Sequence, residues 1–204
     1  MRSIYKIVVC SLLTLSITSC EKDLLEKEQY QKEIYLIGAY NRVWTTEVSY
    51  SNEEVKTYFT VSSSGTLALD RDVNVKMKIN EELVDIYNKK YWTVLNEDKY
   101  YKSLDTDLYS IPSLENTVIK HAEGISAEVP VLIKTASLKI DQSYVIPVEI
   151  ESTTGYPISE SGYKMLILLK LKNDYSGSYQ MSGHTTLEGE TPKTIQKPKT
   201  IKPT

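Results

Sequence analysis

Hydrophobic and polar residues alternate strictly along residues 72–80, and this is the clearest pattern in the chain. Val73, Val75, Met77 and Ile79 would share one face, and the polar residues between them would face the solvent. A period of two residues is typical of a β-strand with one buried face. The segment therefore predicts a half-buried strand.

Several other segments are rich in β-branched and aromatic residues, which favour strands. Small and polar residues that favour turns separate them, for example at residues 62–65 and 153–157. The further predicted strands are residues 34–40, 55–61, 126–134, 144–150 and 163–171. Short strands with turns between them predict an all-β fold, a β-sandwich of seven or eight antiparallel strands.

Two prolines, Pro130 and Pro147, lie inside predicted strands. Proline has no N–H group to donate to a neighbouring strand. We therefore expect each proline at a sheet edge or a β-bulge.

Residues 81–91 break the β pattern, because Leu83, Ile86, Tyr87 and Tyr91 recur at helical spacing. Asn80 before them is a suitable N-cap, and the charges at the two ends of the segment suit the helix dipole. The pattern predicts one short amphipathic helix inserted between strands. We expect this helix to cover an open edge or an end of the sandwich.

The beginning of the chain has the features of a bacterial lipoprotein signal. A positively charged start precedes an apolar stretch at residues 7–17, and small or polar residues then precede Cys20. The stretch is too short to span a bilayer, which takes about 20 apolar residues. We expect a cleaved signal peptide over residues 1–19 and acylation of Cys20; a secretory signal with a chance cysteine is the alternative. The mature protein would be lipid-anchored to the outer membrane and exposed on the cell surface.

Residues 20–32 are highly charged and show no strand alternation. We interpret them as a tether that lifts the folded part off the membrane, with a short helix as the alternative. The acidic start of the tether also resembles the surface-export signals of gut-anaerobe lipoproteins. One sandwich domain would then occupy residues 33–172.

The net charge of the chain is -3, and loss of Arg2 and Lys6 with the signal lowers it by two, to -5. This mildly acidic balance argues against nucleic acid as a partner. Cys10 would leave with the signal and Cys20 would carry the lipid. No thiol would remain for a disulfide, a metal or a nucleophile.

Catalytic and metal-binding chemistry has little support in the sequence. Only two histidines are present, His121 and His184, whereas a structural zinc site needs four ligands. No Gly-x-Ser-x-Gly motif occurs. A glycosidase needs two carboxylates across the scissile bond, but Glu81 and Glu82 fit a helix start. We expect no metal, no cofactor and no enzymatic activity.

Aromatic residues give the strongest indication of binding. The chain has 16 tyrosines and only one phenylalanine, which favours rings with one solvated edge. Aromatic faces stack on sugar rings, so the long connection at residues 92–112 is a candidate glycan platform, with Asp98 and Lys99 as hydrogen-bonding groups. The alternative is that these rings cover the core, where we also expect Trp44. The candidate glycan-binding residues are Trp92, Tyr100, Tyr101 and Tyr109.

The C-terminal part changes in composition. Residues 173–179 resemble the opening of a second β-domain, but after Gly183 the sequence consists largely of Thr, Lys and Pro. No apolar periodicity supports a core there, and such composition is typical of disorder. We expect residues 173–204 to be the start of a truncated second domain followed by a disordered tail.

Part of the chain resembles a known family. The resemblance is carried by the strand at residues 73–79, by "INEELVDIYNKKY", by "LYSIPS" and by "VPVLIKTASLKIDQSYVIPVEIES". These segments are similar to the Ig-like N-terminal domain of unknown function in polysaccharide-utilisation surface lipoproteins of gut anaerobes. The same domain precedes certain surface endo-β-N-acetylglucosaminidases. The resemblance covers about residues 34–171 and implies an Ig-like sandwich with a place in glycan capture and without catalytic residues.

These inferences define one leading hypothesis and two alternatives for function. The leading hypothesis is a non-catalytic surface lipoprotein module that assists glycan capture, with oligo- or polysaccharide and other outer-membrane proteins of the utilisation system as partners. The alternatives are a structural spacer or docking domain for another outer-membrane protein, and an adhesin-like subunit.

Overall fold

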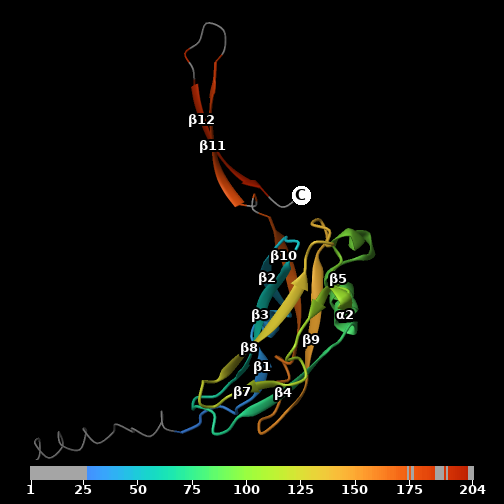
Figure 1. Ribbon diagram of the computed structural model, residues 1–204, viewed down its shortest axis with the longest axis vertical. Coiled ribbons are helices and arrows are strands. Elements are labelled where there is room, and N and C mark those ends of the chain that lie inside the picture. The colour runs from blue at the N-terminus through green and yellow to red at the C-terminus, as the bar shows by residue number, and fades with distance from the viewer. Residues whose placement is uncertain (1–26, 174, 176, 187–190, 192, 202–204) are drawn as a thin grey trace, which may run out of the picture.

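The computed structural model describes residues 27–173, 175, 177–186, 191 and 193–201. The expected signal peptide, Cys20 and most of the expected tether lie outside the described residues. Two β-sheets face each other and enclose the main core, and one short α-helix lies beside the second sheet (Figure 1). The predicted all-β sandwich with one inserted helix is therefore confirmed.

The first sheet has four strands in the order β1-β3-β8-β6, and all its pairings are antiparallel. Its longest pairing joins β3 and β8, and in it Phe59 pairs with Val129. The strands of the first sheet are β1 (Ile34–Leu36), β3 (Glu54–Ser63), β8 (Ser126–Lys134) and β6 (Tyr109–Ser110).

The second sheet has the order β2-β10-β9-β4-β7, with β5 also pairing β9. Its antiparallel pairings are joined by two parallel ones, β2 with β10 and β5 with β9. The strands of the second sheet are β2 (Val43–Ser49), β4 (Val73–Ile79), β5 (Lys102–Ser103), β7 (Thr117–Ile119), β9 (Tyr144–Thr153) and β10 (Lys164–Lys172).

The core between the sheets follows the alternation predicted for residues 72–80. Val73, Val75 and Met77 are buried, and Ile79 at the end of β4 is partly buried. The largest fully buried side chain is Phe59 of the opposite sheet. Strands β9 and β10 differ from β4, because they carry buried residues on both faces. Their nearly continuous hydrophobic runs fit a strand pair that is covered on both sides.

The α-helix, α2 (Glu82–Tyr91), begins within one residue of the predicted start and ends at the predicted residue. Asn80 was expected as the N-cap, but the N-cap residue is Glu81. The Asn80 side-chain oxygen still accepts a hydrogen bond from the N–H of Glu82 at 3.2 Å. The helix lies on the outer face of the second sheet, over β9 and β10, instead of closing an edge or an end as expected. The three 3-10 helices are η1 (Ala39–Asn41), η2 (Val94–Lys99) and η3 (Thr106–Leu108). None of the helices in the described ranges is long and apolar enough to cross a membrane.

The two strand prolines occupy positions that need no N–H donor. Pro130 of β8 pairs with Tyr58 of β3, and the short β6 reaches β8 only at Leu132 and Ile133. Pro147 was expected at an edge or a bulge, but it lies in the central strand β9, where its carbonyl accepts the N–H of Asn80 just after β4 ends. In a strand, the N and O atoms of one residue point to the same side. The missing N–H of Pro147 therefore faces the gap between β4 and β5.

Residues 177–185 and 193–201 differ from the expected disordered tail. Strands β11 (Gly177–Thr185) and β12 (Lys193–Ile201) form an antiparallel hairpin that extends away from the sandwich (Figure 1). Compositional bias predicted disorder here, but alternate residues such as Tyr179, Met181 and Ile195 share one face of the hairpin. Backbone pairing over nine residues in each strand replaces the packed core that the segment lacks.

The last residues of the expected tether contact the sandwich. The Glu28 carboxylate accepts hydrogen bonds from Lys32 and from the backbone N–H of Thr66, in the loop that follows β3. The lysine, followed by the Thr66 N–H group, lowers the pKa of Glu28 to about 2. This part of the charged segment is therefore attached to the domain.

Candidate functional site

Helix α2 is fixed to the second sheet by a small apolar cluster separate from the main core. Leu83 and Val84 of the helix pack against Val145 of β9 and Leu166 of β10. Neighbouring residues in β9 and β10 point into the main core instead, because side chains alternate along a strand. The packing therefore fixes the position of the helix over the sheet. It also fixes the positions of the helix side chains that lie next to the sheet.

Three tyrosine rings form a continuous row along the helix. The rings of Tyr87 and Tyr101 are stacked, with centroids 5.2 Å apart and an interplanar angle of 11°. The Tyr91 ring follows, 4.5 Å from Tyr87 and tilted by 34°. Burial, and then the neighbouring Tyr101, raise the pKa of Tyr87 to about 12. Tyr91 is 49% exposed, whereas Tyr87 and Tyr101 are half-buried, so the row opens to solvent at its Tyr91 end.

A buried amide holds the Tyr101 end of this row. The side chain of Asn88 accepts a hydrogen bond from the Tyr101 N–H at 3.0 Å and donates one to the Tyr101 carbonyl at 2.9 Å. Asn88 is only 5% exposed. Both polar ends of the amide are satisfied, which is the usual condition for burying such a group. The tyrosine is thereby positioned through its backbone.

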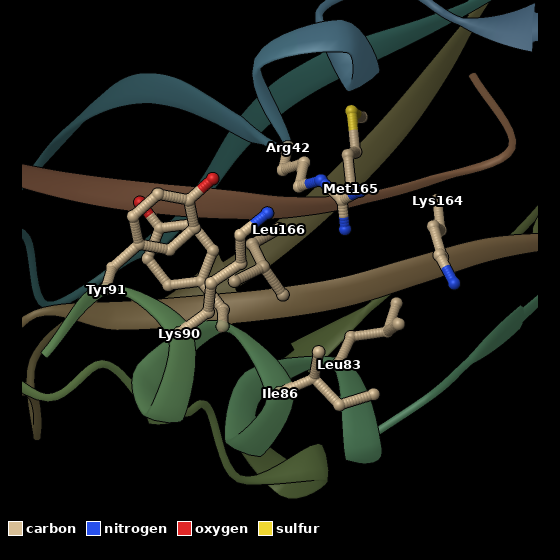
Figure 2. A pocket seen from close by; sticks show the side chains of 9 residues that line it. Arg42, Leu83, Ile86, Lys90, Tyr91, Lys164, Met165 and Leu166 are labelled. Carbon is tan, nitrogen blue, oxygen red and sulfur yellow. The ribbon is translucent and has the colours of Figure 1, made fainter. Parts of the chain in front are cut away.

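A small groove, open to solvent, runs between α2 and the first residues of β10. Figure 2 shows the Arg42 guanidinium and the Lys90 amine reaching over the strand that carries Leu166, with Lys164 further along it. None of the side chains that line the groove is acidic. The apolar and aromatic lining comprises Leu83, Ile86, Tyr87, Tyr91, Met165 and Leu166. The charged lining comprises Arg42, Lys90 and Lys164.

Arg42 reaches the groove from an unusual backbone conformation. Its φ is 62°, the left-handed region, and it is the only non-glycine residue with positive φ in the described ranges. Its N–H donates to the Ala39 carbonyl at 2.8 Å, and its own carbonyl accepts the N–H of Leu166 at 2.8 Å. These bonds hold the turn after η1 against the start of β10. A non-glycine residue in this region costs about 1–2 kcal/mol, so the surrounding turn must stabilise it.

The candidate residues taken from the sequence are only partly brought together. Tyr101 is the one that joins the tyrosine row. Trp92 follows the helix directly and is half-buried, with the amine of Lys99 at 5.6 Å from its ring centroid. Tyr100 ends η2 beside them and is also half-buried.

Tyr109 lies away from the other candidates, in β6 of the first sheet. Its ring packs against the main core, and its hydroxyl is buried without a hydrogen-bond partner. Burial, followed by the charge of Glu81, raises the pKa of Tyr109 to about 12. The ring is therefore part of the edge of the main core and lies apart from the groove.

Trp44 was expected in the core, but it is 37% exposed on the edge strand β2. The residues that the sequence argument missed are Arg42, Tyr87, Tyr91 and Lys164. Tyr87 and Tyr91 were attributed to the buried face of the helix, although their spacing of four already placed the two rings side by side. Nothing in the local sequence indicated that Arg42 and Lys164 would meet there.

The described residues contain no group of three or more His, Cys, Asp or Glu side chains arranged to hold a metal ion. His121 instead pairs with Asp72, its Nδ1 lying 2.6 Å from the carboxylate. The groove beside α2 offers a ligand aromatic rings to stack on, apolar side chains to contact and positive charges to pair with.

The comparisons with known proteins agree with this architecture. The model of a family's N-terminal domain matches residues 30–157, and that of a C-terminal domain matches residues 163–204. The chain belongs to this family. The resemblance to Ig-like N-terminal domains of gut-anaerobe surface proteins is thereby confirmed. None of the curated proteins matches the chain.

Solved structures from Bacteroides share the fold of this family member. One is a multidomain protein including DUF1735 from Bacteroides ovatus, with a TM-score of 0.54, 21% identity, and coverage of 78% of this chain and 51% of that one. Another is an auxiliary nutrient binding protein from Bacteroides thetaiotaomicron, with a TM-score of 0.55 and 16% identity. The match covers 81% of this chain and 56% of that one. A third is a candidate carbohydrate binding protein from B. ovatus, with a TM-score of 0.51 and 17% identity. The match covers 78% of this chain and 43% of that one. The chain thus spans about half the length of these proteins.

Proposed function

We propose that this protein is a non-catalytic module that captures glycan at the cell surface, with the groove beside α2 as its binding site. The observation that carries the proposal is the row of three tyrosines ending in the exposed ring of Tyr91. A pyranose ring presents C–H groups on its flat faces, and aromatic rings stack on such surfaces. Stacking is worth about 1 kcal/mol per ring by analogy with aromatic pairs, so one site would bind weakly.

Two further observations support a binding role. The Asn88 side chain fixes the backbone of Tyr101 at one end of the row. Rings that are already held in place lose little conformational entropy when a ligand binds. The similar structures include proteins described as nutrient binding and as candidate carbohydrate binding. Many surface-anchored copies would compensate for weak individual sites through multivalency.

The test is titration of the mature protein against a panel of host and plant oligosaccharides, with Tyr91→Ala as the site variant. Tyr91→Ala should weaken binding about fivefold to tenfold, because it removes the exposed stacking surface. Tyr40→Ala is the matched control, since Tyr40 is 88% exposed and does not line the groove. Equal binding by wild type and Tyr91→Ala would contradict the site, and no binding by wild type would contradict the function.

We also propose that Cys20 carries the lipid that attaches the protein to the outer membrane. The support is the apolar stretch and the small residues before this cysteine. Replacing Cys20 with Ala should move the protein from the membrane fraction to the soluble fraction. Retention of the Cys20→Ala protein in the membrane pellet would contradict the anchor.

The free edge of β2 favours a second candidate function, docking to another outer-membrane protein. Within the described part of the chain β2 pairs with β10 alone, and hydrogen bonds at Arg42 and Tyr50 point toward that neighbour. The intervening alternate residues Val43, Thr45 and Glu47 therefore direct their N–H and C=O groups outward, where a partner strand can add. The outward carbonyl of Ser49 already accepts a hydrogen bond from the Thr135 hydroxyl at 3.1 Å. Thr45→Pro removes one outward donor and should abolish co-purification with such a partner, while Tyr91→Ala should not affect it.

A further inference from the structure

Three cations meet at the groove from three separate parts of the chain. Arg42 follows η1, Lys90 lies in the last turn of α2, and Lys164 begins β10. Of the side chains that line the groove, none is acidic. The chain as a whole has a net charge of -3, so overall composition does not explain this local excess of positive charge.

Several other cations on the described surface have acidic partners, whereas these three do not. Lys76 lies 2.7 Å from Glu151, and Arg71 lies 2.9 Å from Asp70. Lys120 and Lys170 likewise face acidic side chains. Among the described residues, Arg42, Lys90 and Lys164 form no ion pair, and the lysines instead lie near the rings of Tyr91 and Tyr163.

We propose that the groove binds an oligosaccharide that contains hexuronic acid residues. This inference rests on the proposed function and adds the chemical class of the glycan. Tyr91 stacks on one sugar ring, and Arg42 binds a carboxylate with its planar guanidinium, which matches carboxylate geometry in a bidentate manner. Lys90 and Lys164 act as point charges toward the same or neighbouring carboxylates. A sugar acid combines flat C–H faces with a carboxylate, and the groove offers complements to both.

The backbone of Arg42 supports a specific role for this side chain. The left-handed conformation is held by two backbone hydrogen bonds and directs the guanidinium to the groove. Asparagine adopts this conformation more readily than other non-glycine residues. Arg42→Asn therefore removes the charge while keeping the turn, and it is a sharper test than an alanine variant.

The experiment is calorimetric titration of the mature protein with oligogalacturonate, oligomannuronate and hyaluronan oligosaccharides, each paired with its carboxyl-reduced neutral form. At least one acidic oligosaccharide should bind about tenfold or more tightly than its neutral form, the usual size of a charge-assisted contact. Arg42→Asn should weaken this binding about tenfold, and Lys164→Gln should weaken it severalfold. Lys89→Gln is the matched control and should leave binding unchanged, because Lys89 is exposed on the same helix but does not line the groove. Thermal unfolding of each variant checks that folding is intact.

The contrary outcomes separate the two proposals. Equal binding of acidic and neutral forms, lost in Tyr91→Ala, would overturn the inference and leave the proposed function standing. Acidic oligosaccharide binding that persists in the Arg42→Asn, Lys164→Gln double variant would overturn the assigned site. Equally tight binding of an acidic peptide of the same charge would overturn the assignment of a sugar as the ligand and would indicate a protein partner. No binding of any oligosaccharide, acidic or neutral, would overturn both proposals.

Discussion

Gly38 lies directly against the indole ring of Trp44, so closely that a Cβ atom on Gly38 would be 2.6 Å from Cε3 of the ring. Gly38 also has a φ of 90°, a region that residues with a side chain rarely adopt. This contact closes the turn that carries Arg42 to the groove. Gly38→Ala should therefore lower the free energy of unfolding by about 1–3 kcal/mol, measured by urea denaturation.

Gly124→Ala provides a matched control for this prediction. Gly124 has a φ of 134°, but nothing lies within 4 Å of the Cβ position. Its alanine variant therefore carries only the backbone strain, about 1 kcal/mol. If the two variants lose the same stability, the contact between Gly38 and Trp44 contributes nothing.

Asn88→Ala should be strongly destabilising for a residue in a short surface helix. The substitution leaves the N–H and C=O groups of Tyr101 without partners in a half-buried position. We expect a loss of about 2–3 kcal/mol in the free energy of unfolding. Asn96→Ala, which removes an exposed hydrogen bond to Thr93, should cost at most about 0.5 kcal/mol. Similar costs for both variants would show that Asn88 does not hold Tyr101 in place.

Tyr109→Phe should stabilise the protein, in contrast to most core substitutions. The Tyr109 hydroxyl is buried without a partner, and a group in that state costs about 1–3 kcal/mol. Removal of the oxygen leaves the ring packing unchanged, so we expect a gain of about 1 kcal/mol in urea denaturation. The variant should bind glycan as the wild type does. A loss of stability would indicate that the hydroxyl has a partner in solution.

The attachment of residues 27–32 should depend on pH through Glu28. The pKa of Glu28 falls from about 4.5 to about 2 on folding, because its carboxylate accepts hydrogen bonds from Lys32 and Thr66. A lowered pKa in the folded state stabilises the contact above about pH 4.5 and loses that effect as the pH falls toward 2. The Thr66 amide should accordingly lose protection from hydrogen exchange over this range. Glu28→Gln should show no such pH dependence, and constant protection in the wild type would refute the prediction.

The sequence alone predicted the elements that bury one face along their length, because burial of one face leaves a regular spacing of hydrophobic residues. The alternation of Val73, Val75 and Met77 identified β4, and the spacing of Leu83 and Tyr87 identified α2. The short strands β5, β6 and β7 were missed, since two or three residues cannot show a period. β2 was also missed, because as an edge strand it has few buried residues.

The candidate site was less predictable, because it depends on tertiary placement. The spacing of Tyr87 and Tyr91 is visible in the sequence, but it does not say how far the sheet covers the helix face. The sheet leaves Tyr91 and Ile86 about half exposed, and this opens the groove. Arg42 and Lys164 are more than 100 residues apart in the sequence, and they meet only because β2 and β10 are paired.

The hairpin of β11 and β12 has a consequence for how the molecule loses its structure. Among the described strands these two pair only with each other, and side chains such as Tyr179 and Met181 are nearly half exposed. An isolated two-stranded hairpin is at best marginally stable in water. It should therefore open and close independently while the sandwich stays intact, as a separate low-energy unfolding unit. A protease that acts on opened backbone would reach Lys199 long before it reaches the paired strands around Leu166.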